Sequence, residues 1–122
     1  MIEIDPQALE AFEKEGGDDP VVMLNLLRFR PDGGREAYLR YAEHLAGDIN
    51  ERYGIQIAYL GDGRPALVAE DGQAWDTVVL VRYPNPQSFV DMIRDPDYQA
   101  GAHLRSEALL ESVLQPTTPL MG

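Results

Sequence analysis

Residues 75–83 read WDTVVLVRY and form the clearest strand pattern in this chain of 122 residues. Branched and aromatic side chains dominate the stretch, which is typical of a β-strand. Pro84 follows directly and ends the strand, because proline has no N–H to donate to a neighbouring strand. Successive side chains of a strand point to opposite faces, and here both faces are largely apolar. We therefore predict a strand that is covered on both sides.

Further strands flank this stretch. Residues 21–30, VVMLNLLRFR, are also rich in branched apolar side chains and are bounded by prolines, so they predict a second, largely buried strand. Shorter strands are predicted at residues 55–60 and at about residues 111–115. A Gly-Asp-Gly-Arg-Pro connection leads to residues 66–69, which predict a short strand or an extended arm.

Two helices are predicted in the N-terminal half. Apolar side chains recur at helical spacing over residues 35–53, and Gly54 ends that pattern. A shorter helix is predicted over residues 5–15. Asp5 can accept hydrogen bonds from the free N–H groups of its first turn, and Pro6 suits the first helical position.

Two Asx-Pro pairs predict the helices of the C-terminal half. Asn85-Pro86 begins one helix, and Asp95-Pro96 interrupts it before a second helical stretch from residue 97 to about residue 110. Without the first helix of the chain, the order is strand, helix, strand, strand, helix, strand. That order is the split βαβ pattern.

We therefore predict an α+β fold of ferredoxin-like βαββαβ topology with an extra N-terminal helix. Residues 1–122 would form one domain, with the extra helix at residues 5–15 and the core at residues 20–116. Helices would cover one face of the antiparallel sheet and leave an apolar face bare. A second copy of the chain is the simplest cover, so we predict a homodimer.

The composition excludes several classes of function. The chain carries 21 acidic and 10 basic residues, a formal net charge of -11, so we expect no nucleic acid and no membrane as a partner. The absence of cysteine excludes disulfides, thiolate nucleophiles and Cys-ligated metals. The sequence contains neither a secretion signal nor a stretch long and apolar enough for a membrane helix, so we expect a cytoplasmic location.

Several stretches of the chain form a pattern that we compare with a known family. They are Val78-Val-Leu-Val-Arg-Tyr-Pro-Asn-Pro, Phe89, Asp95-Pro-Asp-Tyr-Gln-Ala and Leu104-Arg105. On these residues the chain resembles the domain-of-unknown-function 1330 family, an uncharacterised bacterial family of the dimeric α/β-barrel superfamily. The resemblance spans about residues 20–116, while the opening helix and residues 61–73 depart from the family pattern.

The resemblance implies a dimer in which two sheets face each other across a two-fold axis, with pockets between sheet and helices. Relatives in the superfamily include monooxygenases, isomerases and heme-using enzymes. A shared fold does not choose among these activities, so neither a reaction nor a cofactor follows from the resemblance.

Arg105 is the most informative polar position, because it shares the apolar face of the last predicted helix with Tyr98. A guanidinium there must be paired or must reach water. One interpretation is an ion pair with Asp97 or Asp76 that pins the helix to the sheet. The other is an anchor for the carboxylate or enolate group of a ligand.

Asn25 and Arg82 are polar insertions in apolar strands, where burial is costly unless the side chain is hydrogen-bonded. Each is a candidate for a pocket wall. Alternatively, Asn25 bonds across a dimer interface and Arg82 reaches water at the end of its strand. Arg28, near the end of its own strand, is expected to be exposed.

The aromatic residues leave similar alternatives open. Tyr38 and Tyr41 have the helical spacing of core aromatics, with their hydroxyls at the edge of the core, and pocket-lining phenols are the other possibility. Trp75, at the start of its strand, is either a lid over a ligand or a packed anchor.

The two histidines do not predict a metal site. His44 and Asp48 are four residues apart, as are His103 and Glu107, but both histidines point away from the apolar stripes of their helices, so we expect solvated pairs. The sequence also lacks a phosphate loop, a dinucleotide fingerprint and the common hydrolase motifs.

These observations lead to two hypotheses. The first is a homodimer whose pocket, lined by some of Asn25, Tyr41, Trp75, Arg82 and Arg105, binds a small organic anion, with or without turnover. The second is a non-catalytic structural or regulatory dimer in which the same groups only fix strand register and helix docking. The sequence identifies no cofactor and does not decide whether the protein is an enzyme.

Overall fold

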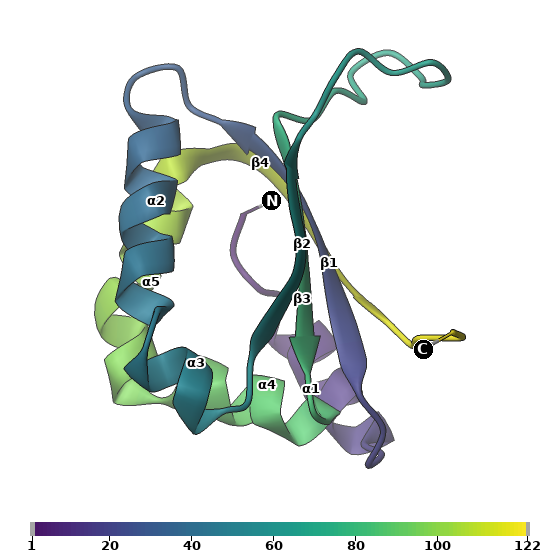
Figure 1. Ribbon diagram of the computed structural model, residues 1–122, viewed down its shortest axis with the longest axis vertical. Helices are drawn as coiled ribbons and strands as arrows, with labels where there is room; N and C mark the ends of the chain where they lie inside the picture. Colours follow the sequence, from purple (N-terminus) through teal and green to yellow (C-terminus); the bar gives the residue numbers. More distant parts are fainter. Residues whose placement is uncertain (1, 122) are drawn as a thin grey trace.

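Strand β1 (Val21–Phe29) lies inside a four-stranded antiparallel sheet in the computed structural model, which describes residues 2–121 (Figure 1). The strand order is β2-β3-β1-β4, with β2 at Gln56–Asp62, β3 at Thr77–Tyr83 and β4 at Leu109–Thr117. In this register Leu24 of β1 pairs with Leu80 of β3. The arrangement is the ferredoxin-like order, so the predicted α+β class is confirmed.

Five helices accompany the sheet: α1 (Pro6–Glu15), α2 (Gly34–Leu45), α3 (Asp48–Arg52), α4 (Pro86–Arg94) and α5 (Pro96–Ala108). Three of them begin at the predicted Asx-Pro pairs. The side chains of Asp5, Asn85 and Asp95 each accept a hydrogen bond from a backbone N–H in the first turn of the helix that follows. The extra N-terminal helix predicted at residues 5–15 is present as α1.

The prediction of one helix over residues 35–53 is wrong, because the chain breaks between α2 and α3. Ala46 is extended, and Gly47 has a φ of 88°, in the region that favours glycine. The apolar spacing continues across the break, which is why the sequence pattern concealed it. After the break, α3 places Ile49 in the main core.

Two other elements differ from their predicted bounds. β4 is longer than residues 111–115, because it pairs with nearly the whole length of β1. Residues 66–69 form no strand; they lie in an arm of the chain that bends at Leu67 and Val68. This arm, residues 63–76, projects beyond the sheet on the side away from the helices, as does the segment after β4 (Figure 1).

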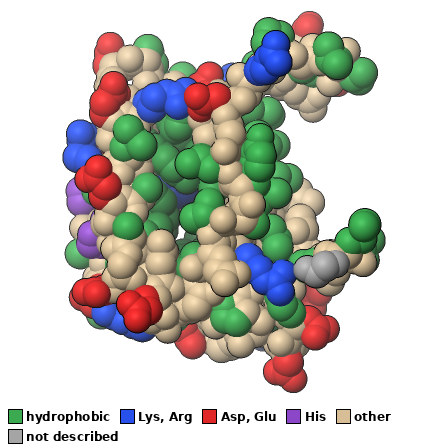
Figure 2. Space-filling model, viewed as in Figure 1, with side chains coloured by type: hydrophobic (Ala, Val, Ile, Leu, Met, Phe, Trp, Pro, Cys, Tyr) green, Lys and Arg blue, Asp and Glu red, His purple; other side chains and the backbone are tan. Residues whose placement is uncertain are grey.

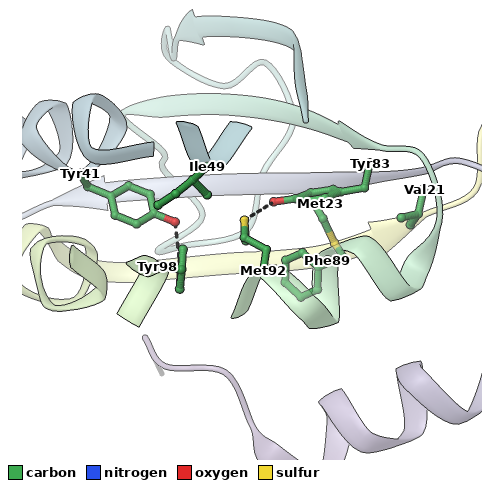
Figure 3. Packing of buried hydrophobic residues seen from close by; sticks show 8 residues of the cluster. All are labelled: Val21, Met23, Tyr41, Ile49, Tyr83, Phe89, Met92 and Tyr98. Carbon is green, nitrogen blue, oxygen red and sulfur yellow. Dashed lines mark hydrogen bonds between the residues drawn. The ribbon is translucent and has the colours of Figure 1, made fainter. Parts of the chain in front are cut away.

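The main core lies between the sheet and the helices (Figure 3). Tyr83 of β3 meets the ring of Phe89 edge-on at 5.1 Å between centroids, and its hydroxyl donates to Met92 Sδ at 3.7 Å. The ring of Phe12 of α1 packs edge-on against the ring of Phe89, at 6.0 Å between centroids. Helix α1 therefore extends this core at the end of the sheet where α4 lies.

The two faces of the sheet have different surroundings. In β1 the odd-numbered residues from Val21 to Leu27 are buried toward the helices, and the even-numbered ones between them are half-buried on the opposite face. We call that opposite face the outer face; its apolar side chains are Val22, Leu24, Leu26, Val78 and Leu80. No helix formed by residues 2–121 covers it (Figure 1).

The segment before α1 runs between the helix layer and the sheet (Figure 1). Ile2 and Ile4 pack against the two core clusters on that side of the sheet. In the described part of the chain, no helix has both the length and the apolar character needed to span a membrane.

Candidate functional site

A cavity of about 1110 Å³ lies between the inner face of the sheet and helices α2 and α5. Its walls are mainly apolar, with a few polar groups among them, which is the usual character of a small-molecule site. Figure 2 shows hydrophobic side chains gathered around the hollow between α2 and β2, where the cavity opens.

The cavity opens beside the edge strand β2, whose main packing contacts among the described residues are with β3. Helix α2 packs against α5, and β2 pairs only with β3. Three large apolar side chains at the opening are consequently more than half exposed: Leu39 of α2 and Ile57 and Leu60 of β2. Large apolar side chains that remain wet beside a cavity are a common feature of ligand sites.

Two of the predicted site residues meet at the cavity wall. Asn25 is at an inward position of β1, and Arg105 is on the buried side of α5, with only 9% of its surface exposed. An Arg105 N–H donates to Asn25 Oδ1 at 3.5 Å, and another donates to the backbone oxygen of Ile2 at 3.2 Å. The Asn25 amide donates to the backbone oxygen of Met23 at 3.4 Å.

The predicted ion pair of Arg105 with Asp97 or Asp76 is wrong. Asp97 pairs with Arg52, and the Asp76 carboxylate accepts from the backbone N–H of Phe29. Within residues 2–121, no carboxylate lies within 4.0 Å of the Arg105 guanidinium, whereas four other arginines have such a partner. Arg105 is thus a buried cation without a counter-charge, on the wall of a cavity.

Tyrosine hydroxyls surround the same region. Tyr41 of α2 and Tyr98 of α5 are buried, and their hydroxyls lie 3.0 Å apart (Figure 3). Burial raises the pKa of Tyr41 well above its usual value; Tyr98 adds to the shift, and Arg105 opposes it. Burial likewise raises the pKa of Tyr38, again against the effect of Arg105. Both phenols are therefore neutral near pH 7 and available as hydrogen-bond donors.

Trp75 and Arg82 lie outside this cavity. Arg82 is at an even-numbered position of β3, so its side chain is on the outer face, opposite the helices. Trp75 lies before β3, at the base of the arm, where the guanidinium of Arg28 is 5.5 Å from its ring centroid. The structure therefore brings together Asn25, Tyr41 and Arg105 and separates them from the other two predicted residues.

Arg28 was expected to be exposed but is an anchor for the arm. It donates to the backbone oxygens of Gly72 and Ala74 and forms an ion pair with Glu111 at 2.8 Å. These contacts hold the arm to β1 and β4. Trp75 is accordingly a packed anchor under Arg28.

The sequence reasoning missed the polar pair at the mouth of the cavity. Arg35, in the first turn of α2, and Asp62, the last residue of β2, form an ion pair at 3.0 Å, and Thr77 also donates to Asp62 at 3.0 Å. Arg35 lowers the pKa of Asp62, with a further contribution from Thr77. Because 27 residues separate Arg35 from Asp62, no local pattern could have paired them.

The prediction of a solvated His44 paired with Asp48 is also wrong. The break at Gly47 puts Asp48 into another helix, and His44 Nε2 lies 2.6 Å from the backbone oxygen of Asp97. The imidazole packs against α5 at Gly101, where a Cβ atom would come within 2.3 Å of the ring. His44 thus joins α2 to α5. No group of three or more metal-ligating side chains occurs among residues 2–121.

A solved structure resembles this chain in sequence as well as in fold. The chain is 31% identical to a protein of unknown function from Rhodopseudomonas palustris, RPA0582, whose crystal structure it matches with a TM-score of 0.91 over 99% of this chain and 98% of that one. No protein-family model and no curated protein matches the sequence.

More distant structures share the fold alone. A dimeric ferredoxin-like protein of unknown function from Jannaschia sp. CCS1 has a TM-score of 0.63 at 9% identity, over 82% of this chain and 99% of that one. The hydroxynitrile lyase of Passiflora edulis has a TM-score of 0.63 at 10% identity, over 84% of this chain and 95% of that one. The ferredoxin-like architecture is therefore shared by proteins whose sequences have diverged widely.

Proposed function

We propose that this chain, which belongs to the same family as the RPA0582 protein of Rhodopseudomonas palustris, binds a small organic anion in the cavity between its sheet and helices. The observation that supports this function is the environment of Arg105. A buried charge is costly unless it is paired, and a guanidinium has five N–H donors, of which two hydrogen bonds are accounted for. An incoming carboxylate supplies the counter-charge and fits the guanidinium in bidentate geometry.

The neighbouring side chains support the same function. Tyr38 and Tyr41 present neutral phenols, and Asn25 presents an amide beside the guanidinium. Such donors can bind the remaining oxygen atoms of a ligand. They would also stabilise negative charge that develops on an enolate, so the site is compatible with turnover of the bound anion as well as with binding alone.

The working unit in this proposal is a homodimer joined through the outer face. That face carries a continuous row of apolar side chains, with Leu24 next to Leu80 at its centre. The arm adds Leu67 and Val68, which are 100% and 95% exposed in the single chain. Wet apolar area of this kind usually marks a protein interface, and the arm projects from the same side of the sheet (Figure 1).

The ferredoxin-like fold and the proposed dimer agree with the resemblance of the sequence to the domain-of-unknown-function 1330 family of the dimeric α/β-barrel superfamily. Two outer faces that close on each other would form the barrel. The cavities would then remain on the opposite sides of the two sheets, between each sheet and its own helices.

Thermal unfolding in the presence of sodium octanoate, benzoate and acetate tests the binding function. We expect at least one of these anions to raise the melting temperature of the wild-type protein, because a ligand that binds only the native state stabilises it. Arg105→Met, which keeps an unbranched stem but removes the charged guanidinium, should abolish that shift. Arg64→Met is the matched control, since Arg64 lies in the exposed arm, away from the cavity.

The alternative, a structural or regulatory dimer, gives a different result. In that case no anion shifts the melting temperature of the wild-type protein, and Arg105→Met changes only stability, by a few kcal/mol, as for the loss of a buried polar partner. Equal ligand-induced shifts in the wild-type protein and Arg105→Met would also overturn the proposal.

A further inference from the structure

The charges around the cavity limit the kind of anion that it can hold. Of the basic side chains that line it, Arg35 is already neutralised by Asp62, and His103 is exposed on α5. Arg105 is the one buried cation among the described residues of the wall. A second negative charge on the ligand would therefore lie in the apolar part of the cavity without a partner, which is strongly unfavourable.

The apolar part of the wall is much larger than a small carboxylate needs. Met23, Val79 and Val81 of the sheet face Leu45 of α2 across the cavity. The volume of about 1110 Å³ lies slightly above the usual range for small-molecule sites. A ligand the size of acetate would occupy only the region next to Arg105 and leave most of this apolar wall without a contact to the ligand.

The mouth continues this apolar path to the surface. Leu39, Ile57 and Leu60 lie at the opening between α2 and β2, and Leu60 is 65% exposed. The cavity therefore has one buried cation at its inner wall and solvent-exposed apolar side chains at its mouth. A ligand that matches it has an acid group at one end and an apolar body at the other.

We propose that the ligand is an amphipathic monoanion: a carboxylic acid with one negative charge and an alkyl or aryl body. Its carboxylate binds at Arg105 and Asn25, and its body extends along the sheet toward Leu60 at the mouth. The class excludes phosphate monoesters and dicarboxylates, which bring up to two negative charges to a site with one buried cation. This inference rests on the proposed anion-binding function and specifies its substrate class.

Calorimetric titration with a homologous series tests the class. Butanoate, hexanoate and octanoate differ only in the number of methylenes, and we expect affinity to rise on the order of fourfold for each methylene that is buried. Octanedioate is the matched dianion, with the same carbon count as octanoate. We expect it to bind at least roughly tenfold more weakly than octanoate, because its second carboxylate has no partner.

A variant at the mouth tests the orientation of the ligand. Leu60→Asp places a negative charge beside the far end of a bound octanoate, so it should weaken octanoate binding by about tenfold while leaving butanoate binding unchanged. Leu110→Asp is the matched control, because Leu110 is 49% exposed at the start of β4 and does not line the cavity. It should change neither affinity.

The results distinguish the binding of an anion at Arg105 from the amphipathic class of that anion. If an anion binds through Arg105 but octanedioate equals octanoate, or butanoate equals octanoate, the amphipathic class is wrong while anion binding stands. An unchanged affinity for octanoate in Leu60→Asp likewise overturns the proposed orientation. If none of the anions binds, anion binding itself fails, and the substrate class fails with it.

Discussion

The Arg35 guanidinium and the Asp62 carboxylate lie 3.0 Å apart and join the start of α2 to the end of β2 across the mouth of the cavity. Both side chains are largely exposed, so the pair should add little to stability. Its more important effect is to remove a positive charge from the cavity. Arg35 also lies over the ring of Phe29, at 4.9 Å, so it would remain at the mouth without Asp62.

Asp62→Asn should therefore widen the range of ligands. The substitution keeps an oxygen acceptor for Thr77 and Arg35 but removes the negative charge that balances Arg35, so we expect octanedioate to gain several-fold in affinity relative to octanoate. Glu36→Gln is the matched control, because it changes the net charge equally from the next position of α2, outside the cavity. The same gain in both variants would show a general effect of net charge.

Leu24→Asp should separate the homodimer into monomers. The substitution places a charge at the centre of the outer face, beside Leu80, where a dry interface would not tolerate it. Sedimentation should give the wild-type protein twice the chain mass of 13.6 kDa and the variant a single chain mass. Leu39→Asp, on the helix side, should remain dimeric. A folded wild-type monomer at micromolar concentration would contradict the proposed dimer.

The hydroxyl pair of Tyr41 and Tyr98 should be strongly non-additive. Tyr41→Phe and Tyr98→Phe each leave one buried hydroxyl without its partner, so each should lower the free energy of unfolding by about 1–2 kcal/mol. The double variant should cost about 1 kcal/mol less than the sum, because it removes both polar groups together. Urea unfolding of the four proteins measures this coupling, and strict additivity would refute it.

Arg28→Ala should loosen the arm. It removes the ion pair with Glu111, the hydrogen bonds to two backbone oxygens of the arm and the stacking on Trp75. Hydrogen exchange in residues 64–74 should become roughly tenfold faster, while exchange in β1 and β3 stays unchanged. Arg64→Ala, within the arm, serves as the control. Unchanged exchange in Arg28→Ala would show that the arm holds its conformation without this anchor.

Asp95 should contribute stability that depends on pH. A hydrogen bond from Tyr53, together with those from the Asp97 N–H and Arg52, lowers the pKa of Asp95 from 3.8 to about 2. The folded pKa is below the unfolded one, so this stabilisation is complete above about pH 4 and is lost as the pH falls through about 2. Asp95→Asn keeps the cap of α5 but cannot titrate.

The stability difference between wild type and Asp95→Asn should therefore shrink as the pH falls from 5 to 2. Urea midpoints measured for both proteins at each pH give this difference. The contributions of the other carboxylates are the same in both proteins and cancel in the difference. A difference that stays constant over this interval would show that the Asp95 contacts do not depend on its charge.

Local chemistry in the sequence determined most of the fold. The Asx-Pro pairs at residues 5, 85 and 95 mark helix starts because a side-chain oxygen and a fixed φ act within a few residues. The strand at residues 77–83 alternates over its own length, and the order of elements predicts ferredoxin-like topology. The break at Gly47 was missed because apolar spacing continued through it.

Only the tertiary structure decided which polar groups share a site. Asn25 and Arg105 are 80 residues apart in sequence and meet because α5 packs over the inner face of β1. Strand alternation places Arg82 on the outer face of the sheet, and Trp75 lies at the base of the arm beside Arg28. The sequence shows that a polar residue interrupts an apolar pattern, but its partner depends on long-range packing. For the same reason, only the fold revealed that, among residues 2–121, no carboxylate pairs with Arg105.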